Sequence, residues 1–443
     1  MTDKVGIFGL GITGQSIYKE LKTKLNRIYC WDDSEINRNN FSKQFDSSCL
    51  VPSDNSSWND LDIIYISPGV PHSHKIFGIA KRNNIKISSD IELFLELNKN
   101  SKIVSVTGTN GKSTTTALIA HILAHAGLNF ECGGNIGLPV LELPRNAKGY
   151  VLELSSFQLD LLDQFNPDIS VLINITPDHL DRYDSFDDYC SSKARAFEGD
   201  GIKVIGLDSE KSKLLFDTLK QAGDKKLIPF STRTNIKNGI TCNENTIHDN
   251  YFNNGKYQTG FLQNLQGKHN NENIAAAFAV CRSLGLNAKE IIDHITTFPG
   301  LKHRMQYVGT KGHFSFYNDS KATNAAAAAA SLSSLGNILW LVGGIFKEEN
   351  LSPIEPYLSN ITKAFLFGRD KLILAKLLDI YKVKYTICDN MDQAFEYAIS
   401  EKAESKREYN ILLAPACASY DQFKNFEDRG DKFVELYDTK QIN

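Results

Sequence analysis

Short apolar runs alternate with amphipathic segments along most of this chain. Runs such as VGIF at 5–8 and DIIYISPGV at 62–70 have the length and composition of buried strands, whereas IELFLELNK at 91–99 has the spacing of a helix. Strands that alternate with helices predict parallel sheets covered by helices. The expected fold class is therefore α/β, and neither an all-β nor an all-α fold suits the pattern.

Breaks in the pattern divide the chain into three predicted domains. The polar stretch NKNSK at 98–102 is typical of a linker, and Pro299 with Gly300 ends a helical segment and favours a boundary. We therefore expect a Rossmann-like domain at 1–98, a central ATP-binding domain at 99–299 and a C-terminal α/β domain at 300–443. At about 150 residues per domain, the length of 443 residues agrees with this division.

Two segments depart from the simple alternation. The asparagine-rich stretch 243–260 is typical of short hairpins. The six alanines at 325–330 follow the strand-like run FSFYND, where a close-packed helix is expected.

The charge balance narrows the choice of partners. With 49 basic and 52 acidic residues, the composition gives no electrostatic reason to expect nucleic acid or an anionic membrane. No apolar run approaches the roughly 18 residues of a membrane span, and the start MTDKV lacks the layout of a signal peptide. We therefore expect a cytoplasmic protein, with a monomer as the default.

Cysteine and histidine give no sign of a metal centre. The eight cysteines form no CxxC pair and no short cluster with histidine, so reduced and mostly buried thiols are expected. His121 and His125 lie one helical turn apart but lack the glutamate of a zinc-protease signature. We interpret these two histidines as part of a helix face.

The stretch VTGTNGKSTTT at 106–116 carries the clearest chemistry. A strand leads into a loop with Gly108 and Gly111, after which Lys112 and Ser113 begin a helix. Amides of such a loop cradle phosphates, the lysine offsets their charge, and a hydroxyl reaches Mg²⁺. Two residues separate the glycines where the standard P-loop has four, yet the order of residues predicts an ATP site.

A second glycine pattern, GLGITG at 9–14, follows the first predicted strand. Backbone amides and the positive end of a helix would face a pyrophosphate there, and Asp32 closes the next strand, where an acid meets a ribose hydroxyl. The pattern suits a nicotinamide cofactor or another phosphate ligand, and a purely structural turn is a further alternative. The residues alone do not decide among these.

Three further polar residues are predicted near the carboxyl ends of strands. Asn135 lies in GGNIGLP, Glu153 in VLELSSFQLD, and His179 in NITPDHLDRY. Strand ends gather in one crevice of a parallel sheet, so Glu153 is a candidate magnesium ligand. A carboxylate on the side of a helix is the alternative, and Ser155 with Gln158 equally suits a capping box.

Several stretches of the sequence form an ordered set from residue 9 to residue 430. They include GTNGKSTTT, GGNIGLP, LELSSFQLD, NITPDHLDRY, HNNEN, LKHR, NDSKATN and APACASYDQFKNFEDRG. In order and approximate spacing this set resembles the Mur ligases. The resemblance implies ATP-dependent ligation of D-glutamate to UDP-N-acetylmuramoyl-L-alanine in peptidoglycan synthesis, with UDP in the first domain, ATP in the central domain and the amino acid in the third.

By this resemblance, the glycine stretch at 9–14 cradles uridine diphosphate and not a nicotinamide cofactor. The residues expected to bind the UDP substrate are Ile12, Thr13, Asp32, Asp33, Gly69, Asn135, Ser155, Gln158 and His179. Many relatives have a basic residue two places after the equivalent of Asp32, and this chain has Ser34 there.

The resemblance also implies a nucleotide and metal site. Its expected ATP contacts are Gly108, Thr109, Asn110, Gly111, Lys112, Ser113, Thr114, Asn270, Asn273, Arg304 and Asp319. Two magnesium ions are implied, with Ser113, Glu153, His179 and Lys193 around them, the lysine being carbamylated by carbon dioxide. From the sequence alone, Lys193 equally suits a solvated helix lysine. Lys112, Glu153, His179 and Lys193 are the expected catalytic residues.

For D-glutamate, the residues that the resemblance implies are Thr323, Lys347, Ser419 and Phe426. The chain departs from the family around them, because Ile345 and Phe346 replace small or polar residues and Tyr420 stands where leucine is frequent. Ser419 and Gln422 in SYDQ also suit a capping box at the start of a helix.

Other functions stay open at this point. A sister ligase with a different amino acid is the nearest alternative, although DQFKNFEDRG favours D-glutamate. An NAD-dependent oxidoreductase would use GLGITG but leave GTNGKSTTT without a purpose. A folate polyglutamylating enzyme would not begin with GLGITG, and a nucleotide sensor would need neither Lys193 nor Lys347.

Overall fold

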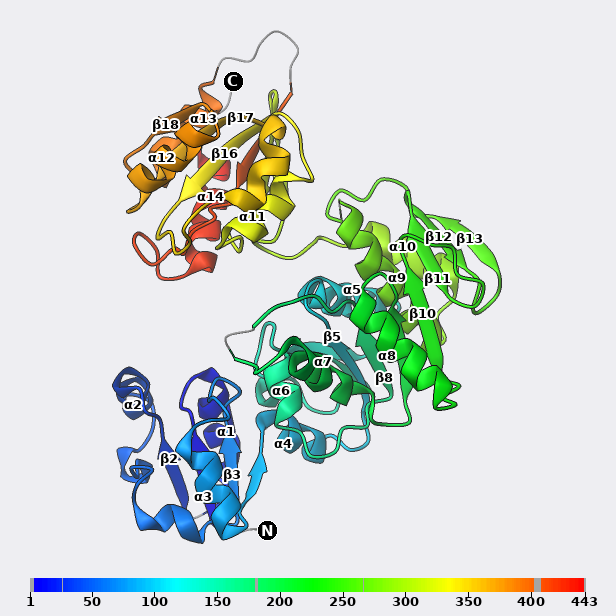
Figure 1. Ribbon diagram of the computed structural model, residues 1–443, viewed down its shortest axis with the longest axis vertical. Helices are drawn as coiled ribbons and strands as arrows, with labels where there is room; N and C mark the ends of the chain where they lie inside the picture. Colours follow the sequence, from blue (N-terminus) through cyan, green and yellow to red (C-terminus); the bar gives the residue numbers. More distant parts are fainter. Residues whose placement is uncertain (1–3, 26, 180–181, 266, 402–407, 442–443) are drawn as a thin grey trace. The chain divides into compact units, whose positions relative to one another are not determined.

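The computed structural model describes residues 4–25, 27–179, 182–265, 267–401 and 408–441 (Figure 1). The chain forms two compact units, one made of Met1–Gly260 with Lys268–Thr297 and the other of Phe261–Gly267 with Phe298–Asn443. Two sheets belong to the first unit and one to the second. Helices alternate with mainly parallel strands in all three, which confirms the α/β prediction.

The first sheet is entirely parallel, with the strand order β2-β1-β3-β4. Its strands are β1 (Val5–Phe8), β2 (Ile28–Trp31), β3 (Ile63–Ile66) and β4 (Lys86–Ser88). The accompanying helices are α1 (Ile12–Leu21), α2 (Glu35–Ser42), η1 (Ser47–Cys49), η2 (Ser56–Asp60), α3 (Lys75–Asn83) and α4 (Asp90–Leu97). The loops after β1, β2 and β3 therefore meet at one edge of this sheet.

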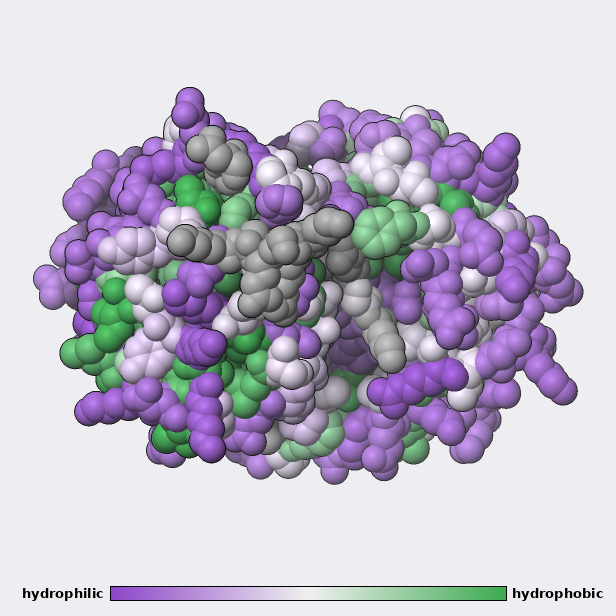
Figure 2. All heavy atoms as spheres, turned by 90° about the horizontal axis from the view of Figure 1, so that it is seen from above, coloured by the Kyte–Doolittle hydropathy of each residue, from purple (hydrophilic) through white to green (hydrophobic). Residues whose placement is uncertain are grey.

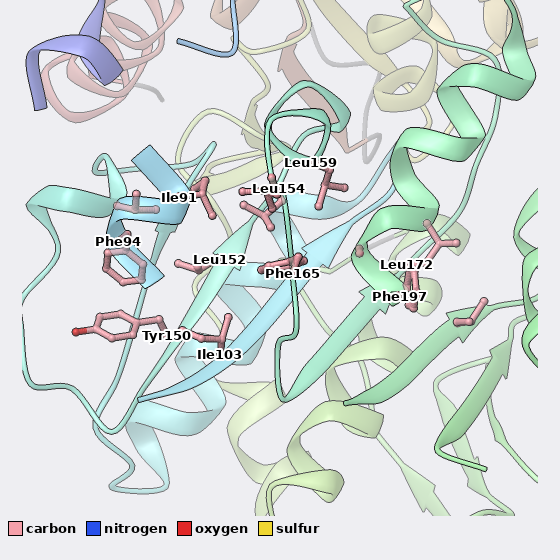
Figure 3. Close-up of a cluster of buried hydrophobic side chains, with 14 of the residues drawn as sticks. Ile91, Phe94, Ile103, Tyr150, Leu152, Leu154, Leu159, Phe165, Leu172 and Phe197 are labelled. Carbon is pink, nitrogen blue, oxygen red and sulfur yellow. The ribbon is translucent and has the colours of Figure 1, made fainter. Parts of the chain in front are cut away.

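Helix α4 packs against the central sheet. It joins the part of the first unit that carries the first sheet, called here the first segment, to the part that carries the central sheet, called the central segment. Figure 3 shows Ile91 and Phe94 of this helix within the buried cluster that also holds Ile103 and Tyr150. The rings of Phe94 and Tyr150 meet edge to face, with centroids 4.7 Å apart. The predicted boundary at 98 follows this helix directly, and a division of the first unit into two domains stays a prediction.

The central sheet has nine strands in the order β13-β12-β11-β10-β9-β8-β5-β7-β6. They are β5 (Lys102–Thr107), β6 (Phe130–Gly134), β7 (Gly149–Glu153), β8 (Ile169–Leu172), β9 (Ile202–Gly206), β10 (Leu227–Ser231), β11 (Ile240–Asn243), β12 (Thr246–Asp249) and β13 (Gly255–Gln258). The last three pair antiparallel, which confirms the hairpins expected at 243–260, and the others pair in parallel.

Helices and short turns connect the strands of the central sheet. They are α5 (Lys112–His125), η3 (Val140–Glu142), α6 (Ser156–Asp160), α7 (Phe186–Ala194), η4 (Arg195–Phe197), α8 (Glu210–Gln221), α9 (Lys268–Ser283) and α10 (Ala288–Thr296).

The second unit has a six-stranded sheet in the order β14-β15-β19-β16-β17-β18. Its strands are β14 (Gln306–Lys311), β15 (Phe314–Asn318), β16 (Ile338–Gly343), β17 (Ile361–Phe367), β18 (Tyr385–Ile387) and β19 (Tyr409–Leu413). Among the described strands of this sheet, only β14 and β15 pair antiparallel, and β14 was not predicted.

The helices of this unit are α11 (Ala325–Leu332), η5 (Ser352–Asn360), α12 (Lys371–Ile380), α13 (Met391–Ile399) and α14 (Phe426–Thr439). The alanine run forms α11, as predicted. Asn324 caps this helix by accepting a hydrogen bond from Ala327 N, and Ala325 and Ala328 are buried against the core.

The visible surface is mainly hydrophilic (Figure 2), and the eight described cysteines form no disulfide. Figure 2 shows hydrophilic side chains over most of the visible face, with apolar ones in separate patches. Among the described residues, no helix combines the length and the apolar character that crossing a bilayer requires. All eight cysteines are free, and most of them are buried, as expected.

Candidate active site

A cavity of about 740 Å³ in the first unit is lined by the first glycine loop and by Lys112, the residue that follows the second glycine loop. The first sheet contributes Gly9, Gly11, Ile12, Thr13, Asp32, Asp33, Ser67, Gly69 and His74 to its wall. The central sheet contributes Lys112, Gly134, Asn135, Ser155, Phe157, Gln158 and His179. Stretches that are more than a hundred residues apart in the sequence thus face one space.

The first loop needs glycine for two different reasons. Gly9 has a φ of +91°, and a Cβ on Gly14 would lie 1.8 Å from the carbonyl oxygen of Gly9. Around Gly11, in contrast, no atom would lie within 4 Å of an added Cβ, and this residue precedes α1 without any side-chain cap. The first amides of α1 therefore stay available to an anion at the cavity.

Asp32 organises this loop from within the protein. Its Oδ2 accepts hydrogen bonds from Leu10 N at 2.7 Å and from Asn37 Nδ2 at 3.0 Å, while Oδ1 accepts from Ser34 N at 2.8 Å. Ser34 in turn caps α2. Asp32 is buried, so its first role is to hold the loop after β1 in place.

Asp33 is the more accessible of the two acids. Its side chain is 59% exposed, and its Oδ2 lies 3.0 Å from Nε2 of His74. Nearby, Arg38 stacks on Trp31 and donates hydrogen bonds to the carbonyl oxygens of Asp32 (2.6 Å) and Asp33 (3.0 Å). The sequence around Arg38 does not predict these contacts, because they depend on how α2 packs against the end of β2.

The loop before α5 is packed tightly against α9. Gly111 has a φ of +83°, and a Cβ there would lie 2.3 Å from Oδ1 of Asn273. The same oxygen accepts a hydrogen bond from Thr115, and Asn273 donates to Oδ1 of Asn270 at 2.8 Å. Two predicted ATP contacts of α9 therefore lie at the start of α5, together with Gly111.

Asn174 and Glu272 support this loop and were not predicted. Asn174 follows β8, and its Oδ1 accepts a hydrogen bond from Asn110 N at 3.0 Å. Its amide group donates to Glu272 Oε2 at 2.7 Å, which joins the loop to α9. Burial raises the pKa of Glu272, which the hydrogen bond from Asn174 partly opposes. Only the position of Asn174 at a strand end could have drawn attention to it.

Lys112 and Lys193 converge behind the loop. Lys112 Nζ donates to the carbonyl oxygens of Gly108 (2.9 Å) and Thr109 (2.8 Å), and Lys193 Nζ donates to Gly108 at 2.9 Å. Lys193 is buried on α7, with its nitrogen 4.7 Å from the ring centre of Tyr189. Burial, and then the charge of Lys112, lower the pKa of Lys193 to about 7. A solvated helix lysine is therefore the wrong interpretation.

Glu153 offers a carboxylate at the end of β7. The residue is buried, and its Oε1 accepts a hydrogen bond from Asn135 at 3.2 Å, while its Oε2 has no partner among the described residues. Because Glu153 belongs to a strand, the alternative of a carboxylate on a helix side is wrong. A buried carboxylate oxygen without a donor suits a cation.

His179 and the short helix α6 complete the central wall. His179 has a φ of +53°, and its half-exposed ring lies 4.9 Å from the ring centre of Phe157. Ser155 and Gln158 form the expected capping box of α6 and also line the cavity. The capping box formed by Ser155 and Gln158 is therefore compatible with the expected binding of the substrate by these two residues.

A metal ion here would need ligands of more than one kind. Within the described ranges, no group of three or more His, Cys, Asp or Glu side chains is arranged to hold one. Glu153 supplies a single carboxylate, so water, hydroxyl, phosphate or carbamate oxygens would have to complete the ligand set. Ser113, at the start of α5, carries one such hydroxyl.

The predicted nucleotide contacts Arg304 and Asp319 belong to the second unit. Asp319 is buried after β15, where it accepts hydrogen bonds from Met305 N at 3.2 Å and from the hydroxyl of Ser331. Burial raises the pKa of Asp319 to about 6. Arg304 is exposed.

Of the residues predicted for D-glutamate, Thr323, Lys347 and Ser419 lie on loops that follow β15, β16 and β19. Lys347 and Thr323 are exposed, whereas Ser419 is buried. The backbones of Ile345 and Ala418 pair through two hydrogen bonds of 2.8 and 3.0 Å, which aligns the loops of Lys347 and Ser419. Lys321, whose side chain contacts the ring of Phe426, was not predicted as a site residue.

The aromatic residue Phe426 stands at the start of α14. Lys321 Nζ lies 4.0 Å from its ring centre. The capping box expected for Ser419 and Gln422 is wrong, because α14 begins at Phe426 and its cap is Asn425, which accepts from Asp428 N at 2.8 Å. The Ser419 carbonyl oxygen instead accepts from Gln422 N in a turn.

Arg429 holds these loops together from below. It is fully buried on α14, and it donates to the hydroxyl (3.0 Å) and carbonyl (2.9 Å) of Ser320 and to the carbonyl of Cys417 at 3.1 Å. A longer contact of 3.4 Å reaches Gly343 O. Burial lowers the pKa of Arg429 to about 10. Sequence reasoning missed Arg429, because its partners come from three separate loops.

Comparison with known proteins identifies these units. A family model described as the Mur ligase middle domain matches residues 106–281, and one described as the Mur ligase, glutamate ligase domain matches 303–417. The UDP-N-acetylmuramoylalanine--D-glutamate ligase of Rickettsia bellii is 48% identical over 443 residues, covering 99% of this chain and 98% of that protein. The protein of the same name from Rhizobium meliloti is 39% identical and covers 97% and 95%.

Solved structures agree on the fold. The UDP-N-acetylmuramate-alanine ligase of Thermotoga maritima superposes with a TM-score of 0.60 over 99% of this chain and all of that one, at 18% sequence identity. A MurF structure from Acinetobacter baumannii gives a TM-score of 0.59 over 78% of this chain and 79% of that one, at 17% identity. At such identities the likeness concerns the fold alone.

Proposed function

The chain belongs to the Mur ligase family, and we propose that it joins D-glutamate to UDP-N-acetylmuramoyl-L-alanine, consuming ATP and releasing ADP and phosphate. Relatives that carry this activity in their name match almost the whole chain. The single observation that carries the proposal is the cavity lined by Gly11 and Ile12 on one side and by Lys112 on the other. Such a cavity accommodates a sugar nucleotide whose free acid approaches a nucleoside triphosphate.

The reaction needs an activated acid, since a free carboxylate is a poor electrophile. In the proposed route, a carboxylate oxygen of the L-alanyl group attacks the γ-phosphorus of ATP, and the bond to ADP breaks. The amine of D-glutamate then attacks the acyl phosphate carbon, expelling phosphate and losing a proton. Placement and charge neutralisation are the protein's main contributions.

We assign the UDP end to the first loop and its neighbours. The amides at Gly11, Ile12 and Thr13 suit the diphosphate, because α1 begins there without a side-chain cap. Asp33 is the exposed acid of this end, with Gly69 lining the same wall. Asn135, Ser155, Gln158 and His179 suit the muramoyl end.

The triphosphate is assigned to the loop 108–114 with Asn270 and Asn273. Lys112 now donates to two carbonyl oxygens of its own loop, and a phosphate oxygen is a stronger acceptor for an ammonium group. Magnesium, when bound, would offset phosphate charge; Ser113, Glu153 and His179 are the residues assigned to hold it. Arg304 and Asp319 are assigned to the nucleotide from the second unit.

Lys193 is assigned as a carbamylated residue. Carbamylation needs a neutral amine, because the nitrogen lone pair attacks carbon dioxide and a proton leaves. The lowered pKa of about 7 favours the neutral form of Lys193 near neutral pH. The product is an anion, which removes the repulsion with Lys112 and suits a second metal ion.

D-glutamate is assigned to the loops of the second unit. Lys347 suits a carboxylate, with Thr323, Ser419 and Phe426 around it. We also propose that the protein acts in the cytoplasm as a monomer, for which size-exclusion chromatography with light scattering is the direct check of oligomeric state.

The decisive assay is amino-acid-dependent release of phosphate with the UDP precursor and ATP. D-glutamate, L-glutamate, L-alanine and meso-diaminopimelate are compared at equal concentration. Release that requires D-glutamate supports the proposal, whereas release with another amino acid identifies a sister ligase. Release with none of them, at a protein concentration where ATP binding is measurable, would refute the ligase assignment.

A further inference from the structure

Arg182 connects two walls of the cavity that come from different parts of the chain. One wall is the loop at 68–70 after β3, and the other contains Phe157 and His179. The Arg182 guanidinium donates hydrogen bonds to the carbonyl oxygens of Pro68 (2.8 Å), Gly69 (2.9 Å) and Val70 (2.9 Å). Three successive carbonyl groups of the first wall are therefore held by one side chain of the central segment.

The same guanidinium also contacts the second wall. Its central carbon lies 4.4 Å from the ring centre of Phe157, and this ring packs against the imidazole of His179. The backbone N–H of Arg182 also donates to the carbonyl oxygen of His179 at 2.9 Å. Arg182 thus fixes both walls relative to each other.

We propose that Arg182 is a positioning residue for the sugar-nucleotide substrate: it sets the span between the loop at 68–70 and the Phe157–His179 wall. The inference rests on the proposed function, in which UDP lies at the first wall and the reacting acid near the second. Arg182 needs no direct contact with the substrate to act in this way.

The chemistry of the contact favours arginine over lysine. A planar guanidinium directs several N–H groups along fixed lines, while an ammonium is a compact group that cannot reproduce this fork. The described hydrogen-bond acceptors of the guanidinium are carbonyl oxygens and include no carboxylate, so its charge is kept beside a cavity assigned to a diphosphate. Within the described chain, its buried Nε finds no acceptor.

The test compares Arg182→Ala with Arg145→Ala. Arg145 also joins the first segment to the central one, through an ion pair with Glu20, but neither residue lines the cavity. UDP binding is measured by calorimetry without ATP, and KM is measured for the UDP precursor, ATP and D-glutamate. We expect Arg182→Ala to weaken UDP binding and to raise the KM of the precursor by about tenfold or more, with less than about a twofold change for ATP.

Guanidinium rescue separates positioning from folding. Millimolar guanidinium, but not methylammonium, is expected to restore part of the precursor KM of Arg182→Ala, since it fits the site between the three carbonyls and the Phe157 ring. Should this variant not fold, Arg182→Lys retains the charge, and it is expected to show the same selective loss of UDP affinity at an unchanged melting temperature.

Several outcomes would overturn the inference. These are an unchanged UDP affinity and precursor KM in the Arg182 variants, an equal loss in Arg145→Ala, or an equal rise in the KM of all three substrates without rescue. If the unmodified protein releases no phosphate with D-glutamate, the proposed function fails, and the UDP binding comparison still decides the role of Arg182.

Discussion

Lys112 and Lys193 share one hydrogen-bond acceptor, the carbonyl oxygen of Gly108, which lies 2.9 Å from each ammonium nitrogen. Two cations that converge on one carbonyl repel each other, and Lys193 is the buried partner. Burial and this repulsion together bring the pKa of Lys193 to about 7. The arrangement favours loss of the proton from Lys193; binding of a phosphate by Lys112 stays a proposal.

Activity should therefore depend on carbon dioxide in a pH-dependent way. With a pKa of about 7, the neutral fraction of the Lys193 amine falls to about a tenth at pH 6 and exceeds nine tenths above pH 8. At a fixed concentration of dissolved carbon dioxide, we expect much stronger activation at the higher pH. Initial rates in gas-depleted and gas-equilibrated buffers measure this. Equal rates in both buffers at every pH would contradict carbamylation.

The same buried lysine should lower the stability of the unliganded protein. Its pKa is about 7 in the folded chain, whereas the ordinary value for a lysine is 10.5, so between these pH values the unfolded chain binds more protons, and stability rises with pH across that window. Lys193→Met removes this dependence. In urea denaturation without carbon dioxide, the difference in the free energy of unfolding between Lys193→Met and the unmodified protein should shrink from pH 7 to about pH 9. A difference that stays constant over this range would contradict the buried amine.

Substitution of Gly111 should abolish ATP binding. In Gly111→Ala the new Cβ would lie 2.3 Å from Asn273 Oδ1, which displaces either the loop or α9. Gly127→Ala is the matched control, because Gly127 also has a positive φ (+72°) but has no neighbour within 4 Å of a Cβ. Both changes carry a strain of about 1 kcal/mol. Only the first is expected to lose nucleotide affinity in calorimetry, and equal losses would refute the assignment.

The sequence was sufficient for much of this molecule because the relevant signals are local. Apolar runs of four to six residues became strands such as β1 and β5, and the alanine run became α11. The two glycine loops lie between a strand and a helix, as predicted, whereas the binding of phosphates by these loops stays a prediction.

Long-range partners explain what sequence reasoning did not provide. Arg182, Asn174 and Arg429 act on backbone or side chains that are distant in sequence, and nothing in their own stretches reveals those partners. The capping box at Ser419 failed because the same short pattern fits a turn, and the stronger cap at Asn425 begins α14 six residues later.

Replacement of Arg429 should unfold the second unit more easily. Arg429→Met leaves the carbonyl oxygens of Ser320 and Cys417 without donors in a buried site. A buried acceptor left without its donor costs about 1–3 kcal/mol, so we expect a loss of about 3 kcal/mol in the free energy of unfolding and a higher KM for D-glutamate. Arg369→Met, at a side chain that is 59% exposed, is the control and should change stability by less than about 1 kcal/mol. An unchanged free energy of unfolding in Arg429→Met would contradict the role described for the Arg429 guanidinium.

Removal of the Glu153 charge at the end of β7 should raise the magnesium concentration that the reaction requires. Glu153→Gln keeps the size of the side chain but cannot offer the unpaired Oε2 as an anion. Magnesium titration of phosphate release should give a half-maximal concentration at least about tenfold higher than in the unmodified protein. Glu142→Gln, whose carboxylate pairs with Lys19, should leave the titration unchanged. Superimposable titrations of Glu153→Gln and the unmodified protein would remove Glu153 from the metal site.

The proposed chemistry depends on ATP activating the acid of the sugar nucleotide as an acyl phosphate. Isotope transfer from UDP-N-acetylmuramoyl-L-alanine labelled with ¹⁸O in both carboxylate oxygens reports on this step. With D-glutamate and ATP, mass spectrometry should find one ¹⁸O atom in each released phosphate and the other in the new amide product. Unlabelled phosphate would contradict an acyl phosphate route, whereas labelled phosphate without an amide product would contradict the proposed transfer to D-glutamate.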